Sequence, residues 1–321
     1  MIRAAVLNAC GTAPTIVERP APVAADGEVT VAVEAVPITP LDVLCASGKS
    51  YFGTPATPYV PGVQGVGRLA DGTPVWFGTS AGMRSGVDGS MAGTVTVPTA
   101  DVVALPDGVP LSLLAALGLS AIAAQAAFTD AGGLSVGDQV VVLGAGGVVG
   151  QAAVQLALLG GARRVIAVAR SAAARARAEE FGAAVALPLL PDDDVASLAD
   201  RLRHAADGPV DLVLDPVFGV PAAAALRVLR PGGRLVNLGS AAGATAPIES
   251  AVLRSGALRI VGYTNNGLST AARAAALTVV AGHAASGRLT VDHEIVPFDA
   301  VADAWARQDA GTAAGRIVLA L

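Results

Sequence analysis

The sequence is poor in cysteine, in lysine and in aromatic residues. Its 321 residues include two cysteines, Cys10 and Cys45, which form no Cys-x-x-Cys pair, so neither a disulfide framework nor a cysteine zinc site is favoured. Buried free thiols in a cytoplasmic protein are the interpretation we adopt. Lys49 is the only lysine, no block of basic residues is present, and the net charge is −5. This charge pattern disfavours nucleic acid as a partner.

Hydrophobic residues make up 53% of the chain, whereas aromatic residues make up only 3%. A large core must therefore be packed from Ala, Val and Leu, which is typical of parallel sheets covered by helices. Gly, Pro or Arg interrupts each long apolar run, so we expect no membrane span. The sequence begins without the apolar stretch and cleavage site of a signal peptide, and we expect a cytoplasmic protein.

The first part of the chain reads as β-rich, because short apolar runs alternate with Gly and Pro turns. We expect strands at residues 3–8, 28–36, 63–69, 73–77 and 93–97. A short helix is expected near Pro40, with Thr39 as its N-cap. Two helices, at 111–119 and 121–128, are expected where this pattern ends.

Strands and helices alternate regularly after that point. Six apolar strands are expected at residues 139–143, 165–169, 185–187, 210–214, 234–238 and 258–262. Helical crossovers between them predict a doubly wound parallel sheet. We therefore expect an α/β protein with a β-rich domain, residues 1–118 plus 265–321, and a Rossmann domain, residues 119–264.

A glycine-rich turn follows the first of these strands. It comprises Gly144, Ala145, Gly146, Gly147, Val148, Val149 and Gly150. A strand precedes it, a helix follows it, and a second strand ends about 20 residues later, which together indicate a dinucleotide fingerprint. Glycines let the backbone approach a pyrophosphate, and the N–H groups at the helix start point at the anion. An ordinary strand-to-helix turn is the alternative.

The end of the second strand predicts which dinucleotide binds. NAD sites usually place a carboxylate there for the ribose hydroxyls, but this chain has Ala169, followed by Arg170 and Ser171, with Arg175 four residues on. Arg can bind a phosphate bidentately and Ser adds a donor, so the pattern favours NADPH. The alternative is that Arg170 and Arg175 belong to a solvated helix face.

These features, over the whole chain, resemble the medium-chain dehydrogenase/reductase superfamily, in its zinc-independent quinone oxidoreductase branch. The segments that carry the resemblance are residues 39–42, 61–67, 115–120, 144–150 and 315–319. The resemblance implies a GroES-like β-rich catalytic domain beside a Rossmann cofactor domain, with the substrate in a cleft between them.

The positions of the zinc ligands in zinc alcohol dehydrogenases hold other residue types here. Thr39, Val63 and Gln64 stand where those enzymes have Cys, His and Glu, and these side chains do not replace zinc ligands. The four-cysteine structural zinc lobe is absent, and the phosphate turn has the longer quinone-reductase spacing. We therefore expect no metal.

The resemblance implies hydride transfer from NADPH to a quinone or to an alkene conjugated with a carbonyl, as in an enone or enoyl thioester. It assigns the catalytic positions to Thr39 and Tyr51, and Tyr51 could donate a hydrogen bond or proton. Tyr59 is the rival if the alignment slips. A surface or packing aromatic is the alternative role for Tyr51.

Further cofactor contacts carry over from the resemblance, each with a structural alternative. Ser120 could instead be a helix N-cap, Asn265 part of a polar turn, and Arg316 a surface charge on an edge strand. The remaining expected contacts lie at the carboxyl ends of strands, where open α/β sheets bind ligands: Val217, Gly239 and Ser240.

Two other functions remain open at the level of sequence. One is an NADP-dependent dehydrogenase that oxidises alcohols to ketones, and the other is a non-catalytic NADPH-binding protein. Relatives often form dimers, and we expect a homodimer that pairs through residues 258–263.

Overall fold

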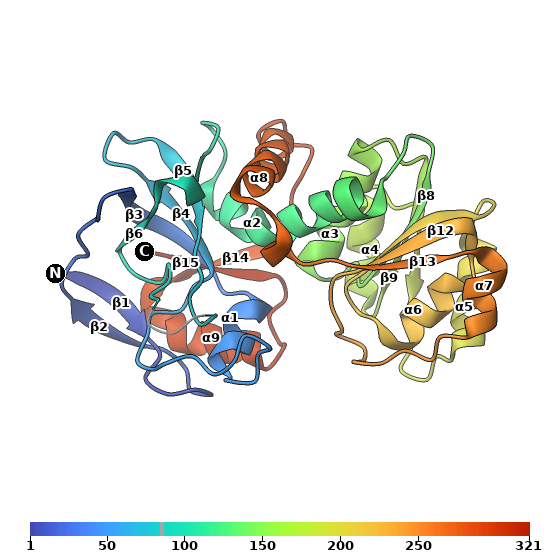
Figure 1. Cartoon of the computed structure of the whole chain (residues 1–321), viewed down its shortest axis with the longest axis horizontal. Coiled ribbons are helices and arrows are strands. Elements are labelled where there is room, and N and C mark those ends of the chain that lie inside the picture. The colour runs from blue at the N-terminus through green and yellow to red at the C-terminus, as the bar shows by residue number, and fades with distance from the viewer. Residues whose placement is uncertain (84–86) are drawn as a thin grey trace. The chain divides into compact units, whose positions relative to one another are not determined.

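The computed structural model describes residues 1–83 and 87–321, which divide into two compact units. The first unit is Met1–Gly118 with Thr270–Leu321, and the second is Leu119–Ser269. Figure 1 shows that the first unit is built mainly of strands, whereas the second has helices around a sheet. The predicted α/β fold class is confirmed.

The first unit contains a seven-stranded sheet in the order β14-β15-β3-β4-β5-β7, with β6 paired to β3, and a separate hairpin of β1 and β2. Its neighbouring strands are antiparallel except β14 and β15, which are parallel. The strands are β1 Ile2–Val6, β2 Thr15–Arg19, β3 Glu28–Pro37, β4 Gln64–Arg68, β5 Pro74–Gly78, β6 Thr94–Pro98, β7 Val102–Ala104, β14 His293–Pro297 and β15 Arg316–Ala320. The helices are α1 Pro40–Ala46, α8 Thr270–Ala285 and α9 Val301–Asp309.

One hydrophobic core holds this unit together. Alternate residues of β3 point inward, as expected for a sheet with one buried face. The core joins segments from both ends of the chain, among them Leu7, Val31, Ile38, Phe77 and Ile317. The C-terminal segment is therefore part of the same core as the N-terminal strands.

The second unit is built on six parallel strands in the order β10-β9-β8-β11-β12-β13. This order, with the reversal between β8 and β11, is that of the doubly wound dinucleotide-binding fold. The strands are β8 Gln139–Leu143, β9 Arg164–Ala169, β10 Val185–Pro188, β11 Val210–Asp215, β12 Leu229–Asn237 and β13 Arg259–Gly262. The helices are α3 Val148–Leu159, α4 Ala172–Glu180, α5 Val195–Ala205, α6 Gly219–Leu226 and α7 Ser250–Gly256. Every residue of β8 is buried, because helices cover both faces of the sheet.

Helix α2, Leu111–Ala126, has a kink at Gly118, two residues before the break between the two predicted helices. Gly118 has φ 24° and ψ −128°, and a Cβ atom there would lie 2.0 Å from Gln64 Oε1. The same oxygen accepts a hydrogen bond from Trp76 Nε1 at 3.0 Å. Only glycine therefore fits at the kink.

One helical stretch, Leu111–Gly132, has the length and composition of a membrane span. It consists of α2 and the π-helical turn Ala127–Gly132 that continues it. The sequence predicted no such stretch, because Gly118 interrupts it. Since 61% of its apolar window is buried inside the structure, and core helices pass the same test, it is weak evidence for a membrane span.

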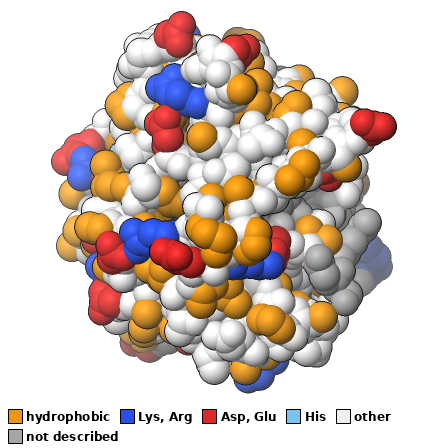
Figure 2. All heavy atoms as spheres, turned by 90° about the vertical axis from the view of Figure 1, so that its left-hand side faces the viewer, with side chains coloured by type: hydrophobic (Ala, Val, Ile, Leu, Met, Phe, Trp, Pro, Cys, Tyr) orange, Lys and Arg blue, Asp and Glu red, His pale blue; other side chains and the backbone are white. Residues whose placement is uncertain are grey.

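Charges on the first unit are paired locally. Ion pairs join Arg3 to Asp299, Arg19 to Asp88 and Arg68 to Glu34. Figure 2 shows one face of the molecule, on which basic side chains lie beside acidic ones. This mixture does not provide the continuous basic surface that a polyanion requires.

Candidate functional site

The glycine-rich turn lies between the end of β8 and the start of α3. Gly144 has φ +63°, and a Cβ atom there would lie 2.7 Å from Val217 Cγ1. At Gly150 a Cβ atom would lie 2.4 Å from the carbonyl oxygen of Gly144. These two glycines are therefore required by backbone conformation and by close packing inside the turn.

The middle of the turn is open. Gly146 and Gly147 are exposed, and Gly147, with φ −82° and ψ 160°, is the N-cap of α3. A Cβ atom at Gly147 would have only the Gly144 carbonyl oxygen within 4 Å, at 3.7 Å. Gly147 has no side chain that could cap α3. The N–H groups of Val148 and Val149, the first two residues of the helix, therefore have no side-chain cap in the open turn. An anion fits this position.

The predicted 2′-phosphate residues lie where β9 ends and α4 begins. Ser171 is the N-cap of α4, and its Oγ accepts a hydrogen bond from the Ala174 N–H at 3.1 Å. Arg175 Nη1 donates to the Arg170 carbonyl oxygen at 2.9 Å, and Arg170 itself is exposed. A Cβ atom at Gly146 would lie 2.9 Å from Ala174 Cβ, so this region adjoins the glycine turn.

Asp215, at the buried end of β11, organises the next loop, a role that the sequence analysis missed. Its Oδ1 accepts hydrogen bonds from the Val217 N–H at 3.0 Å and the Phe218 N–H at 2.7 Å. Its Oδ2 accepts from Asn237 Nδ2 at 3.0 Å. Burial raises the pKa of the Asp215 carboxyl, and these hydrogen bonds oppose the shift. A carboxylate that ends an otherwise apolar strand was the signal available in the sequence.

Asn237, at the end of β12, continues this network. Its Nδ2 also donates to the Gly239 carbonyl oxygen at 2.8 Å. At Gly239 a Cβ atom would lie 2.8 Å from the Pro216 carbonyl oxygen. The predicted residues Gly144, Val217 and Gly239 are therefore brought together at the carboxyl ends of β8, β11 and β12, and Ser240 follows directly.

Ser120 and Asn265 are also brought near each other. Asn265 Nδ2 donates to the Leu119 carbonyl oxygen at 3.0 Å, and Asn265 Oδ1 accepts from the Tyr263 hydroxyl at 2.8 Å. Ser120 is the next residue along α2 and is buried. The Asn265 amide thus fixes the segment after β13 to the start of the second half of α2, whatever else it contacts.

Thr39 is confirmed as the N-cap of α1. Its Oγ1 accepts from the Asp42 N–H at 3.2 Å and donates to Asp42 Oδ2 at 2.6 Å. Asp42 Oδ2 also accepts from the Thr39 N–H at 2.7 Å, which completes a capping box. Burial raises the pKa of the Asp42 carboxyl against these hydrogen bonds. The Thr39 hydroxyl therefore forms its hydrogen bonds with Asp42.

Arg316 is buried, with 6% of its surface exposed, and its Nη1 donates to the Ile38 carbonyl oxygen at 3.0 Å. Burial lowers the pKa of its guanidinium to about 10, and the charge of Asp42 opposes that shift. The alternative of a surface charge on an edge strand is wrong, because β15 lies between β14 and β3. The cofactor contact of Arg316 stays a prediction.

The two candidate tyrosines differ in exposure. Tyr51 is 76% exposed, and its ring centroid lies 4.2 Å from that of Phe52. Tyr59 is 3% exposed, and burial raises the pKa of its hydroxyl. Of the two, Tyr51 has the accessible hydroxyl.

Both cysteines are free thiols. Cys45 is buried, and burial raises the pKa of its thiol. Cys10 is partly exposed, so the expectation of burial is wrong for this residue. Among residues 1–83 and 87–321, no group of three or more His, Cys, Asp or Glu side chains is arranged to hold a metal.

Comparisons with known proteins relate the chain to several oxidoreductases and other proteins. The zinc-binding dehydrogenase family matches residues 148–280. A phenolphthiocerol/phthiocerol polyketide synthase protein of Mycobacterium tuberculosis is 30% identical over 309 residues, which are 92% of this chain and 14% of that protein. The human synaptic vesicle membrane protein VAT-1 homolog is 32% identical over 235 residues, 71% of this chain and 58% of that protein. The chain thus spans only part of the length of both proteins.

A solved structure extends the likeness to the full length. The quinone oxidoreductase from Thermus thermophilus, also described in its complex with NADPH, is 29% identical with a TM-score of 0.79. The match covers 99% of this chain and 100% of that chain.

Proposed function

The chain belongs to the medium-chain dehydrogenase/reductase superfamily, in its zinc-independent quinone oxidoreductase-like branch, and from that premise we propose that it is an NADPH-dependent reductase. The acceptor that we propose is a quinone or an α,β-unsaturated carbonyl compound. The observation that supports this proposal best is the open glycine turn at Gly147 beside Arg170 and Ser171.

The residues of this turn fit a dinucleotide phosphate. Gly144 and Gly150 are packed too tightly for any side chain, whereas the space over Gly147 is open. The exposed Arg170 and the hydroxyl of Ser171, at the adjoining end of β9, supply donors for a 2′-phosphate. When bound, the nicotinamide of NADPH supplies the hydride.

In this proposal, residues of the first unit stabilise the negative charge that develops on the acceptor. The exposed Tyr51 hydroxyl is proposed to donate a hydrogen bond or proton to the oxygen or carbon that becomes negative during reduction. Thr39 is proposed to act through its capping box, because its hydroxyl hydrogen is donated to Asp42. Thr39 is therefore a positioning residue in this scheme.

The two acceptor classes have different support. The likeness to the quinone oxidoreductase from Thermus thermophilus favours a quinone, and the family resemblance of the sequence also implies an enone or enoyl thioester. A panel of 1,4-benzoquinone, a simple cyclic enone and a crotonyl thioester tests this proposal, with NADPH consumption followed by absorbance. Turnover of at least one compound is expected.

The same assay separates the other candidate functions. Oxidation of simple alcohols with NADP+, without turnover of the panel, would replace the proposal by an alcohol dehydrogenase. NADPH binding without turnover of any compound would leave a non-catalytic binding protein. NADH bound as tightly as NADPH would remove the proposed cofactor preference.

We also propose a homodimer in the cytoplasm. β13 lies at the edge of the six-stranded sheet, and a second copy could pair with it there. Sedimentation equilibrium of the purified chain tests the dimer, and fractionation of cells into membrane and soluble parts tests the location. The second test matters because the human relative is named as a vesicle membrane protein.

A further inference from the structure

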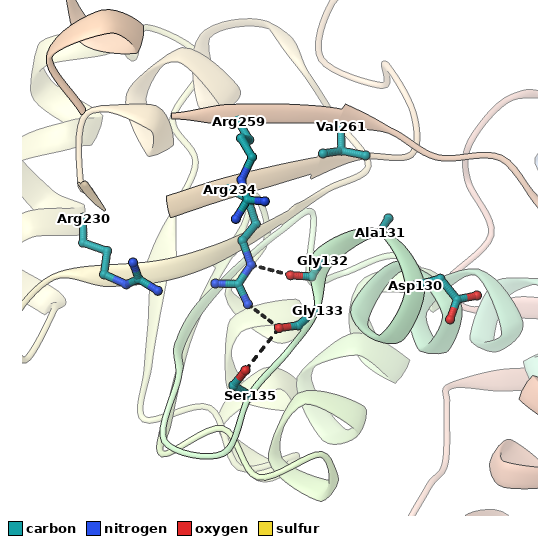
Figure 3. A pocket seen from close by; sticks show the side chains of 9 residues that line it. All are labelled: Asp130, Ala131, Gly132, Gly133, Ser135, Arg230, Arg234, Arg259 and Val261. Carbon is teal, nitrogen blue, oxygen red and sulfur yellow. Dashed lines mark hydrogen bonds between the residues drawn. The ribbon is translucent and has the colours of Figure 1, made fainter. Parts of the chain in front are cut away.

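A pocket in the second unit lies away from the glycine turn. Its volume is about 410 Å³, and Figure 3 shows the side chains that line it. One wall is the end of the π-helical turn, Asp130–Gly133, and the other comes from β12 and β13. Three arginines, Arg230, Arg234 and Arg259, line this second wall. We call this the arginine pocket.

The arginine pocket lies at the amino ends of the parallel strands, whereas the glycine turn lies at their carboxyl ends. Ser135 of the pocket precedes β8, whereas Gly144 follows β8. Arg259 is the first residue of β13, and β13 runs parallel to the other strands. A strand of five residues spans roughly 16 Å. A ligand in the arginine pocket therefore does not share the phosphate contacts of the turn.

Arg234 gives this pocket a rigid wall. Its side chain is buried, its Nε donates to the Gly132 carbonyl oxygen, and its Nη2 donates to the Gly133 carbonyl oxygen at 2.7 Å. Nη2 also pairs with Asp138 Oδ2 at 2.8 Å. These bonds fix the guanidinium plane and the loop together, so the pocket is preformed.

The other two arginines supply donors. Arg230 pairs through Nε with Asp211 Oδ1 at 2.5 Å and donates through Nη1 to the Pro231 carbonyl oxygen at 3.0 Å. The side chain of Arg259 forms no hydrogen bond or ion pair with the other residues that the structure describes. In Figure 3 its side chain extends from β13 toward that of Arg234. An exposed guanidinium beside a second one is stabilised when an anion lies between or beside them.

We propose that the arginine pocket binds the phosphate group of a small phosphorylated metabolite, as a second ligand site distinct from the dinucleotide turn. Arg259 and Arg230 are the charged donors, and the Ser135 hydroxyl, which donates to the Gly133 carbonyl oxygen at 3.3 Å, also lines the pocket. Phosphate suits this site because its oxygens accept hydrogen bonds from several directions at once. Arg259 and Val261 are alternate residues of β13 and line the pocket together, so edge pairing of β13 leaves the pocket available.

Thermal unfolding of the full chain in inorganic phosphate, against chloride at equal ionic strength and pH, tests this proposal. The variant is Arg259→Ala, and the matched control is Arg254→Ala. Arg254 is an exposed arginine of α7 outside the pocket, so its removal changes the net charge equally. Any phosphate bound at the glycine turn contributes equally in all three proteins.

Phosphate is expected to raise the unfolding midpoint of the wild type and of Arg254→Ala by the same amount, and that of Arg259→Ala by about half as much or less. An equal rise in all three proteins overturns the proposal, as does equal stability of the wild type in phosphate and chloride. In Arg170→Ala, phosphate should still raise the unfolding midpoint by the part that depends on Arg259. This result separates the arginine pocket from the proposed cofactor site.

Discussion

Asp42 and Val63 join two separate segments of the first unit, because Asp42 Oδ1 accepts the Val63 N–H at 2.8 Å. Asp42 Oδ2 meanwhile holds the backbone and hydroxyl of Thr39. In zinc alcohol dehydrogenases these two segments supply metal ligands, according to the resemblance above. In this chain a buried carboxylate holds them together through hydrogen bonds.

Replacing Asp42 by Asn should destabilise the first unit by about 3 kcal/mol. The Asp42 carboxylate accepts hydrogen bonds from the Thr39 N–H, the Thr39 hydroxyl and the Val63 N–H, so the amide group of Asn would bring an N–H toward these donors, and Arg316 would lose its nearby opposite charge. Urea unfolding measures the loss. Asp26→Asn, at an exposed position, is the control and should change stability by less than about 0.5 kcal/mol. Equal stability of the two variants would contradict this role.

Arg170→Ala should weaken NADPH binding about tenfold and leave NADH binding unchanged, because only NADPH carries the 2′-phosphate. Dissociation constants for both cofactors, from fluorescence titration, give the comparison. Arg177→Ala is a suitable control, since Arg177 lies on α4, the helix that follows Arg170, but pairs with Glu180. If both cofactors weaken equally, Arg170 does not read the 2′-phosphate.

Two glycines of the turn should respond differently to alanine. Gly150→Ala places a Cβ atom 2.4 Å from backbone, so this variant should lose about 2 kcal/mol or more of stability. Gly147→Ala has open space and an ordinary φ, so it should fold with nearly unchanged stability and yet bind NADPH at least about tenfold more weakly. If the Gly147→Ala variant keeps full cofactor affinity, the pyrophosphate does not bind at this position.

The periodicity of the sequence was enough to predict the doubly wound sheet and the turn. The apolar strand Gln139–Leu143 and the glycines after it are local signals, and the structure has them as expected. The capping role of Thr39 was also local, because it depends on residues three apart.

Contacts between distant segments could not be predicted in this way. The burial of Arg316 depends on β15 inserting between β14 and β3, and its hydrogen bond to Ile38 joins residues 278 positions apart. The hydrogen bond between Asp215 and Asn237 likewise depends on the parallel register of β11 and β12. Long-range pairing of this kind leaves no spacing pattern in a single sequence.

The raised pKa of Asp215 predicts how stability depends on pH. The folded protein binds this proton more tightly than the unfolded chain, whose carboxyl has the usual pKa of 3.8. The contribution of Asp215 is therefore fully present below pH 3.8 and is lost as pH rises through the folded pKa. The unfolding free energy of the wild type minus that of Asp215→Asn should fall over this range, measured by urea titrations at several pH values. A difference that grows with pH would contradict the prediction.

Tyr51→Phe should lower kcat for an accepted substrate about tenfold to about a hundredfold, and should leave NADPH affinity unchanged. The side chain of Tyr51 is exposed, and Phe at this position keeps the ring contact with Phe52. Tyr59→Phe is the matched variant at the buried position. Steady-state kinetics separates the two tyrosines, since a fall in kcat confined to Tyr59→Phe would transfer the role to that residue. Unchanged kcat in both variants would mean that the donor is neither tyrosine.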